Sequence, residues 1–154
     1  MRIEQSYIDK SPWARGPWDQ EPDEVRWEDS ATGLPCLALR NTELGNWCGY
    51  VAVPEEHPAF YAFEDDDLSI RFDVHGGVTF AGPNPAGDSQ PTRGGWWLGF
   101  DCGHRGDLTP GKDARRWDPR DEYRDLQYVV SQCAALARQL LEPPEAEKEI
   151  GGSV

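Results

Sequence analysis

The sequence predicts the α+β class: a small, mainly antiparallel sheet of about four strands with one long C-terminal helix packed on it. Between residues 34 and 104, short apolar segments alternate with a period of two and are separated by turn residues, as in strands joined by loops. Between residues 119 and 141, apolar residues recur at helical spacing instead. A chain of 154 residues is long enough to bury one such core without disulfide or metal staples.

Residues 1–33 are rich in Pro, Trp and acidic residues and show no clear period, which indicates an extended arm. Trp13, Trp18 and Trp27 are too many for a plain linker, because each indole ring buries a large apolar area. We therefore take these three as candidate binding residues. Three surfaces can receive them: the arm's own domain, a second copy of the chain in a homo-oligomer, or another partner.

The strands of this sheet are expected after the arm. Residues 34–40 and 46–53 form a first hairpin around the loop N-T-E-L-G. Residues 69–74 and 78–81 form a second hairpin around a Gly-Gly turn, because glycine reaches positive φ at low cost. Residues 96–104 follow after a Gly- and Pro-rich loop and complete the sheet.

The last element is a helix over residues 119–141. Asp118 is a suitable N-cap and Pro119 suits the first helical position. Its apolar stripe comprises Leu126, Val129, Val130, Cys133, Leu136, Ala137 and Leu140. Residues 34–141 are thus expected to be a single domain, and residues 142–154 a disordered acidic tail.

The formal charge of −13, from 15 Lys and Arg against 28 Asp and Glu, repels nucleic acid and anionic membranes. A solvated surface explains it most simply, and mimicry of nucleic acid is the alternative. The four cysteines, Cys36, Cys48, Cys102 and Cys133, fit no C-x-x-C framework, so free thiols in a reducing compartment are expected. Because no signal peptide or membrane-spanning run is present, a cytoplasmic location is expected.

Asp73 and His75 are candidate catalytic residues. On a strand they would share one face, so that the carboxylate could orient the imidazole as a general base. Asp101 would join them if the second hairpin and the strand 96–104 were neighbours, with Gly99 leaving a gap above the sheet. The competing interpretation is a salt link at the end of a hairpin.

Cys102 and His104 have the i, i+2 spacing of two ligands on one strand face, with His75, Asp107 and Cys48 as candidates for the remaining ligands. Thiolate and imidazole suit zinc, and no other cofactor is expected. The competing interpretation of Cys102 is a thiol packed in the core. Trp97 lies on the opposite face of the same strand and is a further candidate binding residue.

Three segments carry a resemblance to a known family: W-C-G-Y at 47–50, D-V-H-G-G-V-T-F at 73–80 and W-W-L-G-F-D-C-G-H-R-G-D at 96–107. With Y-R-D-L-Q-Y-V at 123–129, they resemble a family of small uncharacterised proteins encoded by tailed phages and prophages. Gly103 departs from the alanine more usual in that pattern. The resemblance spans roughly residues 34–141 and implies a phage-associated origin, but it assigns no catalytic residue.

Two functions remain in view. The first is a small cytoplasmic accessory protein of phage type, in the host cell, that acts by binding another protein, with host takeover or defence against host immunity as examples. It rests on the Trp-bearing arm, the acidity and the lack of any known catalytic motif such as Walker A or H-E-x-x-H. The alternative is a small hydrolase or metal-dependent enzyme that uses the Asp, His and Cys cluster. A virion or assembly role is a third hypothesis.

Overall fold

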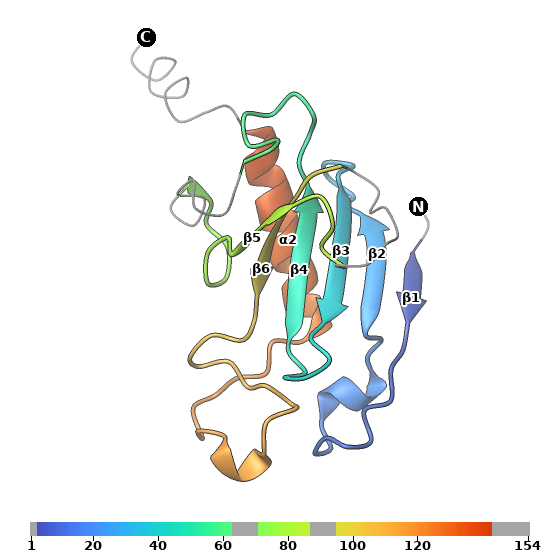
Figure 1. Ribbon diagram of the computed structural model, residues 1–154, viewed down its shortest axis with the longest axis vertical. Helices are drawn as coiled ribbons and strands as arrows, with labels where there is room; N and C mark the ends of the chain where they lie inside the picture. The colour runs from blue at the N-terminus through green and yellow to red at the C-terminus, as the bar shows by residue number, and fades with distance from the viewer. Residues whose placement is uncertain (1–2, 63–70, 87–94, 143–154) are drawn as a thin grey trace.

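The computed structural model describes residues 3–62, 71–86 and 95–142. Within these residues the chain forms one antiparallel sheet with the strand order β1-β2-β3-β4-β6-β5. The long C-terminal helix α2 (Leu126–Leu141) packs on one face of the sheet, behind β3 and β4 in Figure 1. The α+β class is confirmed, but the sheet has six strands rather than about four.

The first expected hairpin is present as β3 (Pro35–Arg40) and β4 (Trp47–Ala52). Alternation sends Trp47 and Val51 toward the helix, and Tyr50 to the opposite face. Gly49 lies on the helix side, where a Cβ would be 2.4 Å from the Phe100 ring. A side chain at position 49 would therefore push β4 away from the ring and from the helix behind it.

The two additional strands come from the segment expected to be an extended arm. β1 (Glu4–Ser6) pairs with β2 (Glu24–Glu28), and β2 pairs along its whole length with β3. Val25 and Trp27 face the helix side and pack against the core. The alternating segment is short and acidic residues surround it, so this strand was not expected from the sequence.

The second expected hairpin is wrong. Residues 71–74 form no strand, residues 69–70 lie outside the described residues, and the only strand of this region, among those described, is β5 (Phe80–Gly82), which pairs with β6 (Trp97–Asp101). The alternating Phe72 and Val74 are nevertheless buried in the core. These side chains are buried as the alternation predicts, but their segment does not pair as a strand. Side chains of α2 instead form the backbone hydrogen bonds that a neighbouring strand would have formed.

The expected helix begins later than its sequence signals suggest. Asp118 and Pro119 lie in a turn, whereas Asp125 is the N-cap and accepts a hydrogen bond of 2.8 Å from the Tyr128 backbone N–H. Five residues of the predicted stripe are buried: Val129, Cys133, Leu136, Ala137 and Leu140. Val130 is only partly buried, so the stripe is rotated slightly from the one expected.

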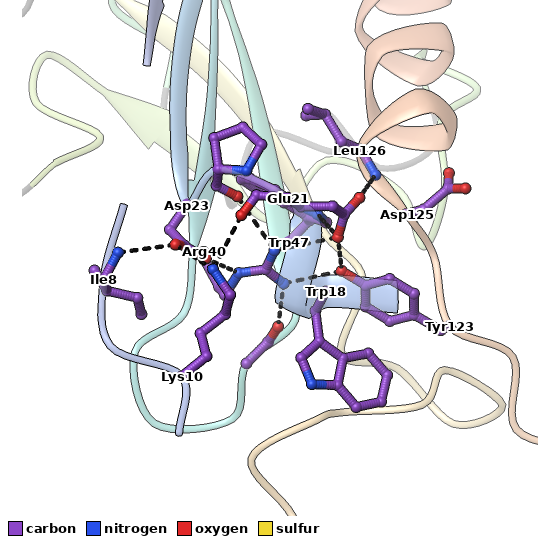
Figure 2. Close-up of polar contacts among 12 residues, drawn as sticks. Ile8, Lys10, Trp18, Glu21, Asp23, Arg40, Trp47, Tyr123, Asp125 and Leu126 are labelled. Atoms are coloured by element: carbon purple, nitrogen blue, oxygen red, sulfur yellow. Dashed lines mark hydrogen bonds and ion pairs between the residues drawn. The ribbon is translucent and has the colours of Figure 1, made fainter. Parts of the chain in front are cut away.

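A buried polar network fastens residues 8–23 to the sheet and the helix (Figure 2). At its centre lies the fully buried guanidinium of Arg40, at the end of β3. Its Nε donates to Asp23, one terminal nitrogen donates to Gly45 O and the Tyr123 hydroxyl, and the other donates to Glu21 and Pro22 O. All five N–H donors of the guanidinium therefore have acceptors.

The acceptors of Arg40 are themselves held by other elements. Asp23 also accepts from Lys10 Nζ at 2.5 Å, and Glu21 accepts from the Tyr123 hydroxyl and, at 2.7 Å, from the Leu126 backbone N–H. Leu126 is the first residue of α2, so Glu21 satisfies one of the free donors at the helix N-terminus. Two cations and two carboxylates make the cluster neutral overall.

No helix in the described ranges has both the length and the apolar composition needed to cross a membrane. All four cysteines are free, and three of them, Cys36, Cys102 and Cys133, are buried.

Replacing Leu136 with Ala tests the packing of α2. Leu136 is fully buried against the sheet, and Leu→Ala changes at such sites cost about 2–5 kcal/mol of unfolding free energy. Urea denaturation measures the loss. Gln127→Ala on the exposed side of the helix is the control and should leave the midpoint unchanged. Equal effects of the two changes would contradict the packing described.

Replacing Arg40 with Leu tests the buried network. The change leaves Asp23 and Glu21 buried with too few donors, and breaking a buried ion pair in this way costs about 3–5 kcal/mol. Arg115→Leu is the matched control, because Arg115 pairs with Asp113 in full contact with solvent. Its urea midpoint should match that of the unmodified protein. A small loss for Arg40→Leu would show that the N-terminal segment is held by other contacts.

Candidate functional site

Residues 71–79, which carry two of the candidate catalytic residues, are attached to α2 by glutamine side chains. Gln139 accepts from the Asp73 backbone N–H at 2.8 Å and donates to the Asp73 carbonyl at 2.7 Å, as a neighbouring strand would. Gln132 accepts from the His75 backbone N–H at 2.8 Å. Gly76 then turns the chain at φ 69°, a left-handed conformation that glycine adopts readily.

His75 is hydrogen-bonded at both ring nitrogens. Nε2 lies 2.8 Å from Asp107 Oδ2, and Nδ1 lies 2.6 Å from the Tyr128 hydroxyl. Because a carboxylate only accepts, the proton of the neutral ring is on Nε2, and Nδ1 accepts from Tyr128. The residue that orients His75 is thus Asp107, and the sequence-based expectation that Asp73 does so is wrong.

Asp107 joins three parts of the chain. Besides His75, it accepts from the His104 backbone N–H at 3.0 Å and from Arg124 Nε at 3.2 Å. Its side chain is almost completely buried, so these donors replace the water that a carboxylate would otherwise bind. Arg124 also lies over the ring of Tyr128, with 4.9 Å between its Cζ atom and the ring centroid.

The three candidate catalytic residues do not converge. Asp73 is exposed, and the two bonds to Gln139 use its backbone. Asp101 lies on the sheet face opposite α2, where it accepts from the Thr79 hydroxyl at 3.2 Å and the Gly103 N–H at 3.0 Å. The gap expected above Gly99 is filled, because the Tyr50 ring lies where a Cβ of that residue would stand.

The candidate metal ligands are only partly brought together. His75 and Asp107 are in contact, and the His104 ring lies 6.1 Å from that of His75. Cys102 is packed in the core, and its burial, followed by the nearby charge of Asp107, raises the pKa of the thiol well above its ordinary value. Across the part of the chain that the structure describes, no three His, Cys, Asp or Glu side chains are grouped to hold a metal ion.

The candidate binding tryptophans have different surroundings. Trp18 is buried edge-on against Trp117 and Tyr123. Trp27 packs against the core, and Trp97 is buried on the sheet face opposite α2. Trp13 is half-buried and lines a groove. Of the four, only Trp13 is therefore placed at a concave surface.

This N-terminal groove was not expected from the sequence. It has a volume of about 420 Å³ and is lined by Tyr7, Ile8, Asp9, Lys10, Ser11, Trp13, Arg15, Asp19 and Gln20. Tyr7 is 65% exposed and Ile8 is 37% exposed. Ile3, which precedes the lining residues in the chain, is 57% exposed. The sequence signal for it was the presence of three large apolar residues in an otherwise polar N-terminus. Their spacing follows no helix or strand period, so it did not predict a shared surface.

A second concave surface lies on the sheet face opposite α2. This open-face cavity of about 250 Å³ is lined by Asn41, Leu44, Asn46, Cys48, Tyr50, Thr79, Phe80, Phe100, Asp101 and Gly103. It is formed by β4, β5, β6 and the loops beside them, which are distant in sequence. No motif in the chain would have identified it.

Comparison with models of protein families, with curated proteins and with solved structures found no match to this chain. The resemblance to phage and prophage proteins stays a prediction.

Replacing Tyr128 with Phe tests whether the contacts around His75 stabilise the fold. The change removes the donor to Nδ1, and the loss of such a hydrogen bond costs about 0.5–1.5 kcal/mol. Thermal and urea denaturation both measure it. Tyr7→Phe is the control, since that side chain is largely exposed. Unchanged stability of Tyr128→Phe would leave the cluster free for a role other than holding residues 71–79 to the helix.

Proposed function

We propose that the chain is a small binding protein that takes up an extended segment of another protein in its N-terminal groove. The observation that carries the proposal is the exposure of Tyr7 and Ile8, which both line this groove. Contiguous exposed apolar side chains with a polar rim mark interaction surfaces. The role is that of an accessory protein in the host cytoplasm, as the resemblance to phage-encoded proteins implies.

The shape of the surface favours an extended segment. β1 is the edge strand of the sheet, and Figure 1 shows it as the outermost strand, with the groove-lining residues following directly along the chain. An exposed sheet edge can accept a further strand, whose side chains then enter neighbouring pockets. The groove is large enough to receive a few such side chains.

Charge favours a partner segment with basic residues. Asp9 and Asp19 line the groove, and the chain carries a formal charge of −13. Lys10 adds no free positive charge, because Asp23 pairs with it. Arg15 is the single other cation among the lining residues. The negative charge of the chain would therefore attract a basic, partly apolar segment over distance, and apolar contacts in the groove would hold it.

The enzyme alternative has less support from the same structure. Both ring nitrogens of His75 are engaged by the protein, so neither is available to take a proton from a substrate. Burial raises the pKa of Tyr128 and of Cys102, which keeps both groups protonated and weakly nucleophilic at neutral pH. The cluster is better suited to holding segments together.

A peptide array tests the proposal. Short extended peptides that vary independently in net charge and apolar content are probed with the labelled full chain. Peptides that combine basic and apolar residues should bind, and the double variant Tyr7→Ser/Ile8→Ser should lose about tenfold or more in affinity. Ile8→Ser keeps the backbone N–H that donates to Asp23, so this contact with the buried network is retained.

The matched control changes two exposed apolar residues outside both concave surfaces, as Tyr61→Ser/Leu141→Ser. It should bind like the unmodified protein. Equal losses for both double variants would show non-specific adhesion, and binding that ignored peptide charge would remove the basic partner from the proposal.

A further inference from the structure

The open-face cavity combines one carboxylate with aromatic walls. Asp101 stands at the end of β6, and its side chain is 34% exposed. Tyr50 and Phe80 lie edge to face with ring centroids 5.3 Å apart, and both line the same cavity. A carboxylate beside aromatic rings is the combination that attracts an organic cation, since the ring faces are negative.

Asp101 differs from three partly or fully buried acidic residues of the polar clusters in having no Arg or Lys partner. Asp23, Asp107 and Glu21 each pair with Arg or Lys. Among the described residues no Arg or Lys forms an ion pair with Asp101. His104 lies 3.4 Å away but is charged only when protonated, and Thr79 and Gly103 supply neutral donors.

Two further groups set the polarity of the cavity wall. Asn46 is 3% exposed and forms part of the wall, and its Oδ1 has no hydrogen-bond partner. Its amide nitrogen donates to the Trp47 carbonyl at 3.3 Å, which assigns the free position to the oxygen. Burial, followed by the charge of Asp101, raises the pKa of the Cys48 thiol to about 12, so Asp101 carries the negative charge of this wall.

We propose that the open-face cavity binds an organic cation of the guanidinium or alkylammonium class, with Asp101 as its counter-ion and the Tyr50 and Phe80 rings as its walls. A guanidinium carries five donors on a flat ion, which suits two-point contact with a carboxylate. The cavity, about 250 Å³, has room for the end of an arginine or lysine side chain. This site is separate from the N-terminal groove and does not rest on the function proposed for it.

The experiment is an NMR titration of the full chain with arginine blocked at both ends, in parallel with the citrulline analogue. Citrulline has nearly the same shape but is neutral. Blocked arginine should shift the amide signals of Tyr50, Phe80 and Asp101 in a saturable way, and the citrulline analogue should bind about tenfold or more weakly. Equal binding of the two, or shifts elsewhere in the chain, would overturn the proposal.

Two further arms separate the sources of the cation. Free arginine and an alanine-flanked arginine peptide present the same side chain as a metabolite or as part of a protein. Tighter binding of the free amino acid identifies a small-molecule ligand, and equal or tighter binding of the peptide identifies a side chain of a partner. Both outcomes require that the cation enters this cavity.

Asp101→Asn should reduce affinity for blocked arginine about tenfold or more, because it removes the charge and keeps the acceptor for Gly103. Asp113→Asn, an exposed carboxylate elsewhere, should have no effect. Phe80→Leu is the second variant, and it tests the aromatic wall if Asp101→Asn does not fold. Undiminished affinity in a folded Asp101→Asn, or in Phe80→Leu where it alone folds, would refute the site.

Discussion

The buried guanidinium of Arg40 is the interaction on which the rest of the fold depends. A charged group without water is tolerated only when all of its donors are satisfied, and here the acceptors come from residues 21–23, the loop after β3 and Tyr123 before α2. Burial lowers the pKa of Arg40, but Tyr123, Asp23 and Glu21 together raise it above its ordinary value, so the charge is kept. The N-terminal segment is therefore part of the folded domain.

The same network sets where the helix begins. Asp118 with Pro119 and Asp125 both have the local chemistry of a helix start, and the sequence alone cannot choose between them. The carboxylate of Glu21 binds the Leu126 N–H, while the Tyr123 hydroxyl is engaged with Arg40 and Glu21. Because these contacts fix the chain up to residue 125 outside the helix, the later start is selected by residues a hundred positions away.

The sequence patterns predicted correctly which side chains are buried, but they did not predict which groups form hydrogen bonds with each other. The period of two in residues 46–53 and 69–74 agrees with the burial of alternate side chains in β4 and at Phe72 and Val74, and helical spacing gave most of the α2 stripe. What alternation could not show was that Gln132 and Gln139 would replace a strand as hydrogen-bond partners. Likewise His75 forms its hydrogen bond with Asp107, 32 residues away, rather than with the nearby Asp73, because the fold determines which carboxylate is buried beside the ring.

The segment 96–107 is rich in chemical groups for a structural reason. It passes from the core at Phe100 and Cys102 to the loop that presents Asp107, so it supplies core side chains and the carboxylate that holds His75 and Arg124. Groups whose hydrogen bonds are already formed within the protein have few donors or acceptors left for a ligand. Groups that a ligand could contact remain at the two concave surfaces, where Tyr7 and Ile8 are exposed and where Asp101 lacks an Arg or Lys partner among the described residues. A binding function is thus favoured by what the fold leaves unsatisfied, and the residues that look most reactive in the sequence are those it has already used.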